Sequence, residues 1–253
     1  IFRVYQGLRN DLTALPNNSD GRSPTPTNLA DFNGICPNSA PNRVMDVTAV
    51  LAQNALPGGK LIYNPRTFLG ANPPGPINDP TAILLVPTSD LNPNGTLKAG
   101  VPIEPLVLRA NAGDCIRFTL RNRLSDPNPD LDGFNGLPMI VGNFNATQVR
   151  PSRRIGLHPQ LVDYDVSDSD GATVGFNPSG TANVGESINY KWYAGEVKLV
   201  GSTLVAAPIE FGAINLIPSD PNKHSNKGAV GALIIEPQGS TWTLDSGTRA
   251  AAT

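Results

Sequence analysis

The chain has 253 residues, with 19 Lys and Arg against 21 Asp and Glu, which gives a formal charge of −2 at pH 7. The basic residues are scattered along the sequence, which argues against nucleic acid or an anionic membrane as a partner. No apolar run approaches the roughly 20 residues that span a bilayer, so we expect no membrane insertion. The 25 Gly and 25 Pro exclude long helices, because proline removes a backbone donor and clashes with the preceding turn.

Taken in chain order, the sequence begins with residues 1–43, whose prolines and Asn/Asp turns predict a long irregular N-terminal arm. Strand-like runs follow, and turn residues separate them. In the run 115–122, apolar Ile116, Phe118 and Leu120 alternate with polar residues and should enter the core. The predicted strands are 43–51, 60–63, 82–87, 106–110, 115–122, 155–162, 187–193 and 229–235. Short strands at this spacing predict an all-β, Greek-key sandwich over residues 44–237 with long loops, and a polar tail or linker at 238–253.

The two cysteines indicate the compartment. Cys36 and Cys115 form an even pair, which favours one disulfide in an oxidising environment. Two buried free thiols are the alternative. The sequence starts at Ile1, which fits either a trimmed, mature product or a start that lies outside the given sequence. We therefore expect a secreted protein, extracellular or periplasmic.

Four segments, in this order, resemble a known family. They are 105–122, with its Arg-Ala-Asn-Ala-Gly-Asp turn; 156–160, Gly-Leu-His-Pro-Gln, with Tyr164 and 169–171 downstream; 184–193, with Gly-Glu-Ser and Tyr-Lys-Trp; and 228–237, Gly-Ala-Val-Gly-Ala-Leu-Ile-Ile-Glu-Pro. Together they resemble the N-terminal plastocyanin-like domain of multicopper oxidases, of the ceruloplasmin- and hephaestin-like or large bacterial extracellular kind. The resemblance covers roughly half the chain and implies a cupredoxin-like sandwich.

The resemblance also implies copper chemistry, and the ligands for it are incomplete. The family builds a trinuclear copper cluster from His-x-His pairs, which a strand can present because residues i and i+2 share a face. His158 matches the first position of one pair, and Gln160 stands at the second. The stretch 210–215, where the second pair is expected, holds no histidine, and His224 further on is expected to be a solvated loop residue. A type 1 site is excluded because both cysteines precede both histidines.

His158 therefore has two interpretations. It is either a surviving copper ligand at an interface, or a histidine kept for packing or hydrogen bonding. Copper binding would need further cupredoxin domains of the same protein or identical subunits.

Calcium is the other candidate metal. Asp90, Asn92 and Asn94 before Gly95 fit the first half of an EF-hand-type loop, but Val101 stands where the twelfth, acidic ligand belongs. Ordinary Asx turns explain the same pattern.

Two hypotheses on function follow. The first is an N-terminal cupredoxin-like domain of a multicopper-oxidase-type secreted protein, which lacks most copper ligands and scaffolds a site completed elsewhere. It would be an oxidoreductase only when further domains complete it. The alternative is a non-enzymatic structural subunit of an extracellular assembly or filament, in which the arm 1–43 wraps a neighbour. A calcium-stabilised binding module is a third possibility.

Overall fold

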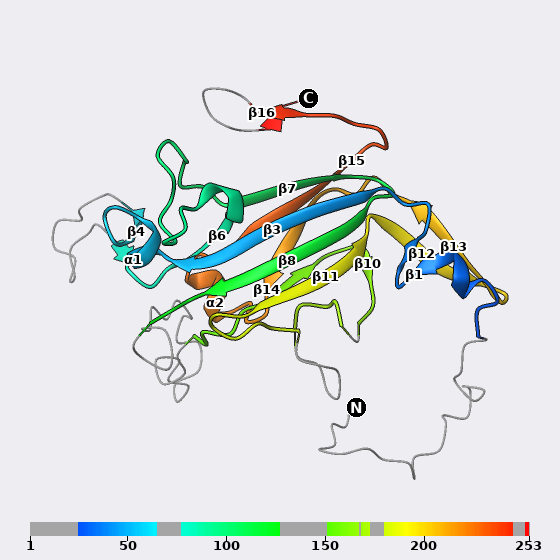
Figure 1. The fold of residues 1–253 in the computed structure, drawn as a ribbon, viewed down its shortest axis with the longest axis horizontal. Helices are drawn as coiled ribbons and strands as arrows, with labels where there is room; N and C mark the ends of the chain where they lie inside the picture. Colours follow the sequence, from blue (N-terminus) through cyan, green and yellow to red (C-terminus); the bar gives the residue numbers. More distant parts are fainter. Residues whose placement is uncertain are drawn as a thin grey trace, which may run out of the picture.

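Two large β-sheets form the body of the fold and face each other (Figure 1). The structure is a computed structural model that describes residues 25–64, 77–126, 151–166, 168–172, 180–244 and 251–252. One sheet has five strands in the order β10–β11–β8–β3–β6, and the other has four in the order β7–β15–β14–β9. Buried side chains from both sheets meet between them. The all-β sandwich expected from the sequence is confirmed.

The five-stranded sheet is built around β3 (Asn42–Leu51) and β8 (Cys115–Arg123), which run parallel. On its other side β3 pairs antiparallel with β6 (Ile83–Pro87). β11 (Ser187–Tyr193) pairs antiparallel with β8, and β10 (Asp163–Tyr164) forms the far edge. β3 therefore lies inside the sheet, although it comes first in the chain among these strands.

The alternation of β8 places one row of side chains in the core. Ile116, Phe118 and Leu120 are buried, whereas Arg117 and Arg121 on the other face are exposed. Because successive residues of a strand point to opposite faces, one face of this sheet is apolar and the other carries charge. The prediction for this strand is confirmed.

The four-stranded sheet contains a second parallel pair. β15 (Gly231–Glu236) lies between β7 (Leu106–Asn111), parallel to it, and β14 (Gly212–Pro218), antiparallel to it. β9 (Leu157–Pro159) pairs antiparallel with β14 at the edge. The strand predicted over 155–162 is thus shorter than expected, and only an isolated bridge pairs Ile155 with Ala182 before it.

The remaining elements are short and lie around the sheets. No helix among the described residues has the length and apolar composition needed to cross a membrane. The elements are η1 (Leu29–Asp31), β1 (Phe32–Asn33), β2 (Cys36–Pro37), α1 (Ala52–Ala55), β4 (Leu61–Asn64), β5 (Ile77–Asp79), η2 (Thr88–Asp90), β12 (Gly195–Val200), β13 (Thr203–Pro208), α2 (Lys223–Asn226), β16 (Thr243–Leu244) and β17 (Ala251–Ala252).

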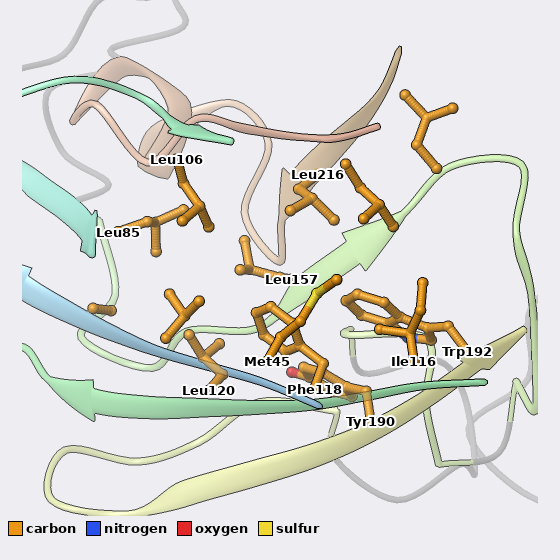
Figure 2. Close-up of a cluster of buried hydrophobic side chains, with 14 of the residues drawn as sticks. Met45, Leu85, Leu106, Ile116, Phe118, Leu120, Leu157, Tyr190, Trp192 and Leu216 are labelled. Atoms are coloured by element: carbon orange, nitrogen blue, oxygen red, sulfur yellow. The ribbon is translucent and has the colours of Figure 1, made fainter. Parts of the chain in front are cut away.

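The core between the sheets is centred on three aromatic rings. Phe118 stacks on Trp192 with ring centroids 4.9 Å apart, and Trp192 stacks on Tyr190 at 5.6 Å. Figure 2 shows this group with Leu157 and Leu216 of the other sheet approaching it. Burial of this apolar surface is the main driving force for the sandwich.

Part of the expected N-terminal arm is tied to the sandwich. Cys36 forms the predicted disulfide with Cys115, their Cα atoms 5.7 Å apart. Thr27 donates a backbone hydrogen bond to Ser202 in the turn between β12 and β13. β3 begins at Asn42, inside the range expected to be irregular.

A buried ion pair joins the residue that follows α2 to β5, in the two-stranded sheet β4–β5. The Lys227 ammonium lies 2.5 Å from a carboxylate oxygen of Asp79, and the two side chains are 0% and 5% exposed. The other oxygen of Asp79 accepts hydrogen bonds from the amide and the hydroxyl of Thr81. The backbone carbonyl of Lys227 also accepts from the amide of Ile83, the first residue of β6. The ion pair and the backbone hydrogen bond therefore connect Lys227 to β5 and to β6.

Candidate metal centre

His158 sits where two backbone segments touch each other. A Cβ on Gly156 would lie 2.2 Å from the carbonyl oxygen of Gly171, and a Cβ on Gly171 would lie 2.0 Å from the carbonyl oxygen of Leu157. Gly171 also has φ +78°, in the left-handed region that glycine adopts most easily. Only glycine allows this approach, which brings residues 169–172 against β9 and the Asp170 carbonyl against the His158 ring.

The contact with Asp170 determines which ring nitrogen of His158 carries the hydrogen. Nδ1 of His158 lies 2.7 Å from the Asp170 carbonyl oxygen. A carbonyl oxygen only accepts, so Nδ1 carries the hydrogen, and in the neutral ring Nε2 keeps its lone pair. Tyr164 meets the ring edge-on, with centroids 5.4 Å apart and planes at 82°. Burial, together with the nearby carboxylates of Asp170 and Asp163, raises the pKa of Tyr164.

The segment that carries Asp170 is itself anchored to β11. The carbonyl of Ser169 accepts a hydrogen bond from the indole of Trp192 at 2.9 Å, and the Ser169 hydroxyl accepts one from the amide of Lys191 at 3.1 Å. A carboxylate oxygen of Asp170 accepts from the amide of Ala172 at 2.9 Å. The His158 ring is thus oriented by a loop that is bonded to the aromatic core.

Two amides occupy the positions beside His158. Pairing of β9 with β14 sets His158 opposite Ile217, and the backbone amide of Gln160 donates to the Asn215 carbonyl at 3.1 Å. The Asn215 side-chain amide donates to Oε1 of Gln160, also at 3.1 Å. The structure therefore brings together His158, the second position of its His-x-His match and the stretch expected to hold a second pair.

These residues do not fit a complete copper site. Carboxamides are poor copper ligands beside imidazole. Among the described residues no group of three or more His, Cys, Asp or Glu could hold a metal ion. A shallow depression next to His158 is lined by residues 158–164 and 166, and Leu161, with φ 65° and 66% exposed, turns the chain at its rim. The site offers one imidazole and open space.

His224 is not the solvated loop residue that the sequence predicted. It lies in α2, is 0% exposed, and its Nε2 donates to the carbonyl of Ser152 at 2.7 Å. Nδ1 is buried and has no hydrogen-bond partner among the described residues. Burial lowers the pKa of His224, while the Ser152 contact and the Asp220 charge raise it less. The sequence prediction was wrong because polar neighbours say nothing about distant segments that cover a residue.

The proposed calcium loop uses its side chains internally. The amide of Asn92 donates to the Thr96 hydroxyl and to the Leu97 carbonyl. Oδ1 of Asn94 accepts from the amide and the hydroxyl of Thr96, which is an Asx turn. Asp90 ends the short helix η2 before this turn. These contacts agree with the turn interpretation of the pattern.

Sequence reasoning missed two members of the His158 site. The Asp170 carbonyl is a backbone group, so no residue type marks it, but Gly156 and Gly171 near the histidine motif were a signal of close backbone approach. Asn215 lies in the stretch 210–215, for which the sequence indicated only the absence of histidine. Its alternation with buried Ile214 and Leu216 marks a strand whose outward side chains could face Gln160.

The comparisons with known proteins find fold likeness only. No protein-family model and no curated protein matches the sequence. The structure is similar to copper nitrite reductase from Nitrosomonas europaea, with TM-score 0.40 and 15% identity, over 78% of this chain and 42% of that one. It is also similar to a multi-copper oxidase from Pseudomonas thermotolerans, with TM-score 0.41 and 12% identity, over 80% of this chain and 31% of that one. The chain spans less than half of either protein, and likeness at this level assigns neither family nor activity.

Proposed function

We propose that this chain is a cupredoxin-like domain of a multicopper-oxidase-type secreted protein, related to the N-terminal domain of that family. In this proposal it supports a copper site that another domain or chain completes, and His158 is its one ligand. The observation that carries the proposal is the hydrogen bond from Nδ1 of His158 to the Asp170 carbonyl, which leaves the Nε2 lone pair for a metal.

The surroundings of His158 support this role. Histidines that bind metals usually donate their other ring hydrogen to a carbonyl or carboxylate, which fixes both tautomer and orientation. Here the carbonyl belongs to a loop that is bonded to Trp192 through Ser169. The ring of His158 is therefore held in one orientation, with Nε2 available to a metal. A histidine kept only for packing would not need this.

The neighbours of His158 support completion from elsewhere. Gln160 and Asn215 bond to each other and offer no imidazole. Both point outward from the four-stranded sheet, as does half-buried Ile217, so a second domain could reach the same face. Bound copper would supply one-electron transfer, and this chain would contribute a fixed Nε2 and a scaffold. The buried disulfide fits the oxidising compartment of a secreted protein.

The alternative, a structural subunit whose arm wraps a neighbour, finds no specific support in the described residues. Residues 27–38 contact their own chain: Asn28 bonds to Leu204 on β13, and Asn33 accepts from Lys191 on β11.

Copper analysis of two forms of the protein tests the proposal. The chain of 253 residues should hold less than stoichiometric copper after dialysis against a weak chelator, whereas the chain joined to the domain or subunit that completes the site should hold it. In this completed product, His158→Gln should remove copper or slow oxygen reduction at least tenfold. The matched variant Gln160→Ala changes a residue two positions along the same face. It should retain the copper content and the rate of oxygen reduction of the unsubstituted protein.

Two results would overturn the proposal. Stoichiometric, chelator-resistant copper on this chain alone would mean that its ligand set is complete. Unchanged copper content and spectrum in the His158→Gln product would mean that this histidine is no ligand.

A further inference from the structure

Basic side chains that are scattered in the sequence gather on one face of the fold. Arg117, Arg121 and Arg123 occupy alternate outward positions of β8, with Thr119 between the first two, and Lys191 of β11 points to the same side. The three arginines are exposed and Lys191 is half-buried. Among the described strands of this sheet, two acidic residues share this face: Asp46 of β3 pairs with Arg121 at 2.7 Å, and Asp163 of the edge strand β10 accepts a hydrogen bond from the amide of Val197.

The other three cations have uncharged partners. Nε of Arg117 donates to the side-chain oxygen of Asn42 at 2.6 Å. Nζ of Lys191 donates to the side-chain oxygen of Asn33 at 2.8 Å and to its carbonyl. Arg123 donates to a backbone carbonyl at 3.3 Å. These contacts orient the side chains and leave their charges without a neutralising carboxylate among the described residues.

Two of these cations oppose each other directly. The β8–β11 register sets Arg117 opposite Lys191, and like charges at such positions destabilise a sheet. Val44, the register partner of Arg117 on β3, is 72% exposed and supplies no charge. Repulsion between Arg117 and Lys191 therefore destabilises the sheet, and a carboxylate or a neutral residue at either position would remove this repulsion.

From this arrangement we infer that the outer face of the five-stranded sheet binds an acidic polysaccharide, through the surface formed by Arg117, Arg121, Arg123 and Lys191. The row from Arg117 to Arg123 extends about 20 Å, since a strand rises roughly 3.3 Å per residue. A row of that length matches anionic groups repeated along an extended polymer better than one small anion. The whole chain carries a charge of −2, so attraction of a polyanion requires a local cluster of positive charge such as this one.

This inference is independent of the copper proposal, because the face lies on the sheet that β9 and β14 do not belong to. The ligand that we infer is a sugar chain with repeated carboxylate or sulfate groups. Alginate carries carboxylates and dextran sulfate carries sulfates, so the two polymers distinguish these groups, and neutral dextran is the uncharged comparison.

The test measures binding of the 253-residue chain to these three polymers at pH 7 and low salt. The wild-type chain should bind alginate or dextran sulfate, ignore dextran, and lose affinity as salt rises. Arg117→Gln with Lys191→Gln should weaken binding about 10- to 30-fold and flatten the salt dependence. Its melting temperature should be unchanged or higher, because the opposed charges are gone.

The matched control is Lys60→Gln with Lys198→Gln, which removes the charges of two exposed side chains, one just before β4 and one on β12. It should bind as the wild type does. Three results would overturn the inference: no binding of the wild type to either anionic polymer, equal loss in the control, or tighter binding of duplex DNA than of both polysaccharides.

Discussion

Removal of the Lys227 ammonium should destabilise the fold more than its small size suggests. Lys227→Met keeps the length of the side chain and leaves the Asp79 carboxylate buried, with only the donors of Thr81 among its described neighbours. Breaking a buried pair by removing one partner costs about 3–5 kcal/mol, because the remaining charge stays desolvated. For a domain whose stability is about 5–15 kcal/mol, this is a large fraction.

The double variant distinguishes this cause from loss of packing. In Lys227→Met with Asp79→Asn, the asparagine oxygen can still accept from Thr81 and no buried charge remains. We expect the double variant to recover about 2 kcal/mol relative to the sum of the single variants. Urea unfolding followed by tryptophan fluorescence measures all four species, and equal slopes would show that the denatured state is unchanged.

An exposed pair provides the control. Lys198 lies 2.8 Å from Glu196 on β12, with 65% of its side chain exposed, so Lys198→Met should cost less than about 1 kcal/mol. The reasoning is refuted if Lys227→Met costs no more than Lys198→Met, or if the double variant loses the full sum of the two single losses.

Three further predictions concern other parts of the fold. Burial lowers the pKa of His224 below its unfolded value near 6.5, so its contribution to stability is present above that pH and is lost as the pH falls toward the folded pKa. Thermal melts between about pH 7.5 and 5 should show this loss, and His224→Gln should flatten the dependence of the melting temperature on pH. Cys36→Ser with Cys115→Ser opens a loop of sequence separation 79 and should lower the free energy of unfolding by about 2–4 kcal/mol in urea titrations. Gly171→Ala should cost more than about 2 kcal/mol and shift the imidazole NMR signals of His158, because the new Cβ meets the Leu157 carbonyl oxygen.

Each of these predictions has a matched control. His158→Gln should leave the acid dependence of the melt in place, and if it removes that dependence, His224 is not the group responsible. Reduction of the wild-type disulfide should reproduce the double-serine variant, and a stability loss below about 1 kcal/mol in both would contradict the prediction. Gly185→Ala has φ +85° and no atom within 4 Å of its Cβ, so it should cost only about 1 kcal/mol; equal costs at Gly171 and Gly185 would rule out the steric explanation.

The strands that the sequence predicted best are those with local signals. The run 115–122 alternates apolar and polar residues between Gly113 and the end of the strand, and β8 matches it to within one residue. β12 and β13 were not predicted, although Val197 and Leu199 alternate there with charged residues; their hairpin pairs with neither large sheet, and much of it is exposed. β3 pairs parallel with a strand some 70 residues away, which no local pattern can encode.

For the candidate site, the sequence identified His158 and its incomplete ligand set, and it did not anticipate what surrounds them. The partner of Nδ1 is a backbone carbonyl, and the partner of Gln160 comes from another strand. His224 was misjudged for the same reason: Ser152, which covers its ring, lies 72 positions earlier in the chain. Side-chain type indicates chemistry, whereas the pairing of distant segments decides exposure and partners.

The place of β3 inside the five-stranded sheet has a consequence for the order of folding. β3 is synthesised before both of its neighbours, and its parallel partner β8 is not complete until Arg123. Long-range parallel pairing is slow because loop closure must precede the contacts that reward it. Until then Val47, Ala49 and Leu51, fully buried in the native sheet, remain open to wrong partners on a growing chain. Refolding yield should therefore fall with protein concentration more steeply than native stability alone would suggest.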